Sequence, residues 1–300
     1  MMGRNRKLAI GLALLTVYLV WGSSFLAIRF AVETLPPFLM AGTRTLIAGV
    51  VLYAWRRASG DVAPARVEWR SAIFVGIFLW VGGNGGIVWA EQWITSSIAA
   101  LLNSTVPLWL VILDALRPGG QRPNFLSIIG LTVGFGGVAI LVESTAFAST
   151  SGINFMGTSV LLFSALSWSL GSLFARHGKF PASPLLATAM QLLAGGAGLL
   201  LVGIFSGEWN LLAHGEFLPR SVFAWIYLTI FGSGVAYVAY TWLLRTAPLP
   251  LVSTYAYVNP IVATILGYWI AAEPFTWRML IAAVLIVGSV ALTTAAHLSR

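Results

Sequence analysis

The chain of 300 residues has no cysteine and very few charged residues. The lack of cysteine excludes disulfides and thiolate metal sites. Charged residues make up only 9% of the sequence, whereas apolar residues make up 58%. A soluble protein with so few charges would lack a surface to keep it in water. The composition therefore indicates an integral membrane protein.

Acidic residues are scarcer than basic ones, nine against seventeen, which gives a net charge of +8. The basic residues lie in short clusters between apolar segments, where they orient helices, so we expect no nucleic-acid partner. No Gly-x4-Gly-Lys-Ser/Thr pattern is present, and we therefore expect no ATPase within the chain. The sequence also lacks a buried histidine, a midplane carboxylate pair and a metal-ligand cluster. We expect neither an enzyme nor a bound cofactor or metal.

Long apolar stretches dominate what remains, and a membrane-spanning helix needs about 20 such residues. We predict spans near residues 8–30, 37–55, 71–90, 94–116, 124–142, 154–175, 183–205, 221–243, 249–271 and 275–297. The first span continues through Trp21-Gly22-Ser23-Ser24-Phe25 without a small-residue cleavage site, so it is predicted to be an uncleaved helix. The fold class is all-α, in the membrane.

The distribution of basic residues predicts the orientation. With a cytoplasmic N-terminus, thirteen basic residues fall inside and three outside, namely Arg29, Arg220 and Arg278, while Arg44 lies within a span. Positive charge concentrates on the cytoplasmic side of membrane proteins. We therefore predict ten helices with both termini in the cytoplasm.

The two halves of the chain resemble each other. Trp21 and Arg29 reappear as Trp168 and Arg176, 147 residues later, and Trp89 and Pro107 reappear as Trp242 and Pro260, 153 residues later. Five spans is an odd number, so the second half, residues 147–300, would enter the membrane from the side opposite the first, residues 1–146. Such inverted repeats surround a central site in many secondary transporters.

Polar and aromatic residues within spans are candidates for contact with a substrate, because the bilayer offers them no partners. The candidates for substrate binding are Trp21, Trp80, Asn84, Asn103, Trp168, Tyr237, Ser253 and Tyr257. Pro107 and Pro260 interrupt the fourth and ninth spans and are predicted hinges. The alternative to substrate contact is helix packing for each tryptophan. For each hydroxyl, the alternative is a hydrogen bond to a backbone carbonyl of its own helix.

Arg44 is the one basic residue well inside a span. It is expected to hold a substrate carboxylate or to organise nearby carbonyl groups, with snorkelling toward the surface as the alternative. No carboxylate lies near the midplane, since the acidic residues fall at helix ends and in loops. We therefore expect transport without an obligatory midplane proton carboxylate, although a mobile glutamate at a helix end would overturn that expectation.

The motif Trp21-Gly22-Ser23-Ser24-Phe25, Pro37 with Arg44, the prolines of the fourth and ninth spans, and Glu273 after Asn259-Pro260 together resemble the EamA branch of the drug/metabolite transporter superfamily. Within it, the chain is most similar to bacterial inner-membrane exporters of the YedA/YddG type.

The resemblance implies two inverted five-helix repeats around a cavity lined by spans one, three, four, six, eight and nine. It further implies alternating-access export of small amphipathic metabolites, foremost neutral or aromatic amino acids, across the bacterial cytoplasmic (inner) membrane. The alternative is an importer or exchanger of other small metabolites or drugs. The expected partners are a small-molecule substrate and membrane lipid, with the chain acting as a monomer or a homodimer.

Overall fold

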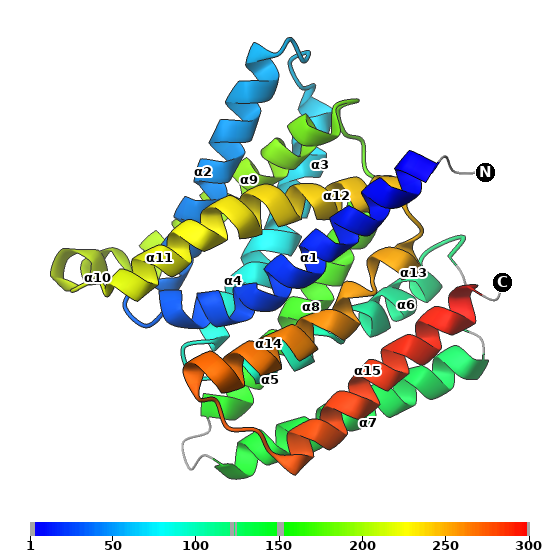
Figure 1. Ribbon diagram of the computed structural model, residues 1–300. Coiled ribbons are helices and arrows are strands. Elements are labelled where there is room, and N and C mark those ends of the chain that lie inside the picture. The colour runs from blue at the N-terminus through cyan, green and yellow to red at the C-terminus, as the bar shows by residue number, and fades with distance from the viewer. Residues whose placement is uncertain (1–3, 121–122, 124, 149–152, 299–300) are drawn as a thin grey trace.

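The computed structural model describes residues 4–120, 123, 125–148 and 153–298, and every regular element in this part of the chain is helical (Figure 1). The first half contains α1 (Arg4–Ala31), α2 (Pro37–Ala58), α3 (Arg66–Gly76), η1 (Ile77–Asn84), α4 (Gly85–Ala90), α5 (Ser96–Asn103), α6 (Val106–Leu116) and α7 (Phe125–Ala148). The second half contains α8 (Ile153–His177), α9 (Pro184–Phe205), α10 (Trp209–His214), α11 (Pro219–Tyr227), η2 (Leu228–Ala236), α12 (Tyr237–Thr246), α13 (Leu249–Val252), α14 (Tyr255–Ala271) and α15 (Trp277–Leu298).

The helices follow the predicted segments to within a few residues, and the all-α class is confirmed. Seven of them, counted among the described residues, are long and apolar enough to cross a membrane: Arg6–Ala31, Pro37–Ala58, Arg66–Ala90, Ser96–Leu116, Phe155–His177, Pro184–Phe205 and Pro219–Thr246. Three shorter apolar helices, Phe125–Ile140, Val258–Ala271 and Trp277–Leu292, occupy the fifth, ninth and tenth predicted positions. The protein is multi-pass, while the count of ten crossings stays a prediction. The short helix α10 was not predicted.

Four of the predicted spans are irregular. The third and the eighth each contain a π-helical segment, η1 and η2. The fourth is interrupted at Ser104 and Thr105, and α6 then begins at Val106 with Pro107 as its second residue; the ninth is interrupted at Ser253 and Thr254. Pro260 was predicted to interrupt the ninth span, but it lies inside α14. A proline removes one backbone donor, and this helix continues past that loss.

Helices α2 and α9 pack at very short range through glycines. A Cβ atom at Gly49 would lie 2.8 Å from the backbone nitrogen of Leu193, and one at Gly196 would lie 2.7 Å from that of Leu46. Small residues allow such close backbone approach between membrane helices. The two contacts are reciprocal, because Gly49 and Leu46 precede Gly196 and Leu193 by the same 147 residues.

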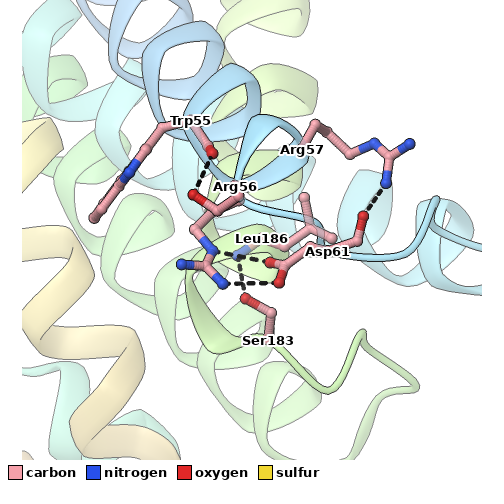
Figure 2. A network of polar contacts seen from close by, with 7 residues as sticks. Trp55, Arg56, Arg57, Asp61, Ser183 and Leu186 are labelled. Atoms are coloured by element: carbon pink, nitrogen blue, oxygen red, sulfur yellow. Dashed lines mark hydrogen bonds and ion pairs between the residues drawn. The ribbon is translucent and has the colours of Figure 1, made fainter.

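An acidic residue follows each of these two helices. Asp61, beyond α2, accepts two hydrogen bonds from Arg56, at 2.9 and 2.7 Å (Figure 2). Hydrogen bonds from Arg56 and then from Ser183, the N-cap of α9, lower the pKa of Asp61 to about 2. Glu208, beyond α9, accepts hydrogen bonds from the backbone nitrogens of Phe38 and Leu39 at the start of α2, at 3.1 and 2.9 Å. Each acid thus ties the end of one helix to the start of the other.

Candidate substrate pocket

A pocket lies among α1, α2, η1, α4, α5, α8, η2 and α14, which come from both halves of the chain. Its wall consists of Trp21, Ser24, Phe25, Ile28, Arg44, Trp80, Asn84, Ile87, Asn103, Trp168, Gly232, Tyr255 and Asn259. The four residues from α1 are spaced three, four and seven apart, so they share one face of the helix. The local helical repeat therefore turns one stripe of α1 toward the pocket.

Aromatic rings form one continuous cluster at this wall. Trp21 is at its centre, with ring centroids 5.4 Å from Trp168, 4.8 Å from Tyr240 and 5.4 Å from Tyr255. Trp80 extends the cluster from the other side, 6.5 Å from Trp168. All four of these pairs are edge-on or tilted rather than stacked face to face, as aromatic pairs prefer. The cluster offers flat apolar surfaces to a ligand.

Arg44 brings a positive charge to the same wall. Its side chain is only 2% exposed and donates hydrogen bonds to Asn84 Oδ1 at 2.7 Å and Ser233 Oγ at 3.0 Å. The guanidinium carbon lies 5.7 Å from the Trp80 ring centroid, in cation–π contact. Snorkelling, the alternative role, is inconsistent with this inward placement.

Most candidates from the sequence lie at the pocket wall, although their contact with a substrate stays a prediction. The wall includes Trp21, Trp80, Asn84, Asn103, Trp168 and Arg44. Tyr237 lies behind the wall: it is fully buried, its ring is 4.9 Å from Trp80, and its hydroxyl donates to Gln191 Oε1 at 2.7 Å. Ser253 lies at the break before α14 and is not part of the wall, nor are Pro107 and Pro260. The side chain of Tyr257 is outside the described residues.

The candidates chosen from the sequence leave out seven wall residues. Ser24, Tyr255 and Asn259 are polar residues within predicted spans, whereas Phe25, Ile28, Ile87 and Gly232 offered no polar signal. The stripe that begins at Trp21 would have identified the three on α1. Likewise, Tyr255 and Asn259 are four residues apart on α14, one turn of helix. Gly232 carried no side-chain signal, and its carbonyl accepts a hydrogen bond of 3.5 Å from Trp21 Nε1.

Two glutamates lie near the turn that joins α4 to α5. Glu273 accepts hydrogen bonds from the backbone nitrogens and hydroxyls of Ser96 and Ser97, at 2.6–3.1 Å. Glu91 is fully buried, and neither of its carboxyl oxygens has a hydrogen-bond partner among the described residues. Arg29 donates instead to the backbone carbonyls of Glu91 and Gln92, at 2.5 and 3.1 Å. The sequence had placed Glu91 at a helix end or loop, without indicating burial.

The described part of the chain contains no group of three or more acidic or histidine residues that would suit a metal ion. The pocket wall, all of it described, includes no aspartate and no glutamate. The chemistry that it offers is therefore aromatic, amide and cationic.

Comparison with known proteins shows the family to which this chain belongs. Residues 8–143 and 155–295 each match the EamA-like transporter family. The inner membrane transporter YedA of Escherichia coli, itself uncharacterized, is 34% identical over 94% of this chain and 89% of its own. An uncharacterized transporter of Archaeoglobus fulgidus is 26% identical over 97% of this chain and 98% of its own.

A crystal structure with 23% sequence identity superposes with a TM-score of 0.67 and covers 95% of this chain and 96% of the other. At that identity the likeness concerns the fold alone. The family matches span nearly the whole sequence, and the relatives named as inner-membrane transporters agree with the long apolar helices. The chain therefore belongs to the EamA-like transporter family and is a multi-pass protein of the inner membrane.

Proposed function

We propose that this transporter exports small amphipathic metabolites, foremost neutral and aromatic amino acids, by alternating access. The observation that carries the proposal is the pocket itself, where three tryptophans, Arg44 and three asparagines converge from helices of both halves. Aromatic surfaces with a few placed polar groups suit a ligand that is part apolar and part polar. An aromatic amino acid has that character.

Many alternating-access transporters consist of two similar halves of opposite orientation. The reciprocal packing of α2 on α9 supports this arrangement, as does the equivalence of Asp61 and Glu208, again 147 residues apart. The pairing of helices is consistent with it as well: the third span packs on α8, and its counterpart, the eighth, packs on α1. A two-fold axis between the halves would exchange these pairs.

The irregular helices supply places where the bundle can change shape. η1 and η2 occupy matching spans, and π-helical turns are frequent at functional sites. The breaks before α6 and α14 also fall in matching spans, the fourth and the ninth. We propose that one half rocks against the other about the regions of Pro107 and Pro260, closing one side of the pocket as the other opens.

The experiment is counterflow in liposomes that contain the purified protein. Vesicles preloaded with an unlabelled aromatic amino acid should accumulate the same labelled amino acid transiently and saturably. Protein-free vesicles are the control. Absence of counterflow across a broad amino-acid panel would reject the substrate class.

Opposite substrate gradients, imposed in separate runs, then distinguish export from the alternative of import or exchange. An exporter should give the higher flux when the gradient runs from the side of the termini to the other side. A higher flux in the opposite direction would reject export, although it would still show that the protein transports the substrate.

A further inference from the structure

We infer that the pocket selects carboxylates: its ligand is a molecule with an aromatic or apolar body and a carboxylate that pairs with Arg44. The inference rests on the proposed use of this pocket for substrate, and it narrows the substrate class. It concerns the ligand's carboxylate, whether or not the ligand also carries the ammonium group of an amino acid.

The first support is the state of the guanidinium. Arg44 is 2% exposed, and its Nε has no hydrogen-bond partner among the described residues. The two other nitrogens each donate one bond, to the neutral groups of Asn84 and Ser233. An arginine carries five N–H donors, so several remain for a ligand. Nε and one terminal nitrogen form the fork that binds a carboxylate with two parallel bonds.

The second support is the balance of charge. The three ion pairs among the described residues do not involve Arg44, and the pocket wall contains no carboxylate. Glu91 acts on Arg44 only through space, without a hydrogen bond or an ion pair. A buried cation that lacks a partner is costly in a membrane protein. A ligand carboxylate would remove that cost.

The third support is the arrangement of rings beside the charge. Trp80 lies under the guanidinium, and its ring connects through Trp168 to Trp21. A ligand whose carboxylate reaches Arg44 therefore has aromatic surface for its body along the same wall. A cationic aromatic ligand would contact the same aromatic surface, but Arg44 would repel its positive charge. The pocket should therefore disfavour amine drugs and favour aromatic acids.

The test uses three probes that share an indole ring: indole-3-propionate, tryptophan and tryptamine. Calorimetric titration of the purified protein in detergent measures their binding without requiring transport. We expect indole-3-propionate and tryptophan each to bind at least about tenfold more tightly than tryptamine. This factor corresponds to the free energy of one charge-assisted hydrogen bond. Equal or tighter binding of tryptamine, or no binding of either carboxylate, would overturn the inference.

Substitutions assign the preference to Arg44. Arg44→Gln should weaken both carboxylates at least about tenfold and leave tryptamine unchanged or tighter, while Arg44→Lys, which keeps the charge without the fork, should be intermediate. The control is Arg220→Gln, which changes an exposed arginine that pairs with Glu33 and is not part of the wall. Unaltered carboxylate binding in a folded Arg44→Gln protein would also overturn the inference. If the carboxylates bind but no amino acid shows counterflow, the proposed function fails and the selectivity for carboxylates stands.

Discussion

Asn84 is a wall residue that controls whether Arg44 is available to pair with a substrate. Its Oδ1 accepts a 2.7 Å hydrogen bond from Arg44, so it fixes the guanidinium with a neutral partner. Asn84→Asp keeps the shape but supplies an internal counterion. We expect the apparent affinity for a carboxylate substrate to fall at least about tenfold, because the introduced carboxylate forms an ion pair with Arg44 in place of the substrate. The concentration dependence of counterflow measures this.

Asn84→Ala is the matched comparison, since it removes the hydrogen bond without adding charge. Its loss of affinity should be only a few-fold. If Asn84→Asp transports like the original chain, Arg44 does not pair with the substrate's carboxylate.

Glu91 and Glu273 are two buried glutamates near one turn, and they should respond oppositely to loss of charge. Glu91 lies one residue beyond the span Arg66–Ala90; burial, followed by the charge of Glu273, raises its pKa, while Arg29 and Arg44 lower it less. Glu91→Gln removes an unpartnered acid, so the unfolding temperature in detergent should hold or rise. Glu273→Gln removes an acid with four hydrogen bonds and should cost about 1–3 kcal/mol of unfolding free energy.

The pH dependence of the Glu91→Gln effect follows from the direction of that shift. The folded chain holds a proton on Glu91 at pH values where the unfolded chain has lost it, so stability decreases as pH rises through this window. The gain in unfolding temperature from Glu91→Gln should be near zero at about pH 4, where the unfolded carboxyl is largely protonated, and should widen toward neutral pH. A gain that shrinks as pH rises would contradict the burial of an unpaired acid.

At the scale of single residues, the sequence indicated which residues need a cavity or a polar partner, but not which way each side chain points. Trp21 and Asn84 were found because aromatic and amide groups inside a span need a cavity or a partner. Tyr237 fitted the same rule, yet its partner is Gln191 behind the wall. The rotation of each helix about its axis decides between these cases. The π-helical turns of η1 and η2 alter that rotation, and no residue pattern in the sequence revealed them.

At the scale of elements, glycines on α9 set how closely its neighbours approach the pocket. A Cβ atom at Gly195 would lie 2.4 Å from Cβ of Trp80, on the helix that supplies this wall residue. Gly195→Ala must therefore displace Trp80. We expect about 1–3 kcal/mol of destabilisation from overpacking, and a loss of counterflow rate. Thermal unfolding and liposome counterflow measure the two effects.

Gly288→Ala is the control for this substitution, since a Cβ atom there meets nothing within 4 Å. Alanine favours helix over glycine, so this variant should be neutral or slightly stabilised. Equal behaviour of the two variants would mean that Trp80 is not held by contact with α9.

The positions of helices could be predicted because runs of apolar residues are long and the loops contain turn residues. The interruptions were harder. Pro107 coincides with the break before α6, whereas Pro260 lies inside α14 and the break precedes it. A proline removes one backbone hydrogen bond, and packing against other helices decides where the chain bends. Such contacts between distant segments leave no local signature.

At the scale of the whole molecule, the repeat extends further than the tryptophans and arginines that first indicated it. Ser59 and Ser206 are the C-caps of α2 and α9, and each precedes a glycine with positive φ, Gly60 at 95° and Gly207 at 79°. Glycine adopts this left-handed conformation without steric cost. The offset is 147 in both pairs. Two helices with the same length, the same cap and the same turn thus occupy equivalent places in the halves.

Inverted orientation predicts that these equivalent positions lie on opposite sides of the membrane. Ser59 and Ser206 are both exposed, and their hydroxyls donate hydrogen bonds to carbonyls of their own helices, those of Trp55 and Gly203. Because the chain has no cysteine, Ser59→Cys and Ser206→Cys each create the only thiol. In intact cells a membrane-impermeant maleimide should label position 206 and spare position 59. Permeabilised cells should show labelling of both, which verifies that each thiol is reactive. Labelling of both from one side would place α2 and α9 in the same orientation and would reject an inverted relation between the two halves.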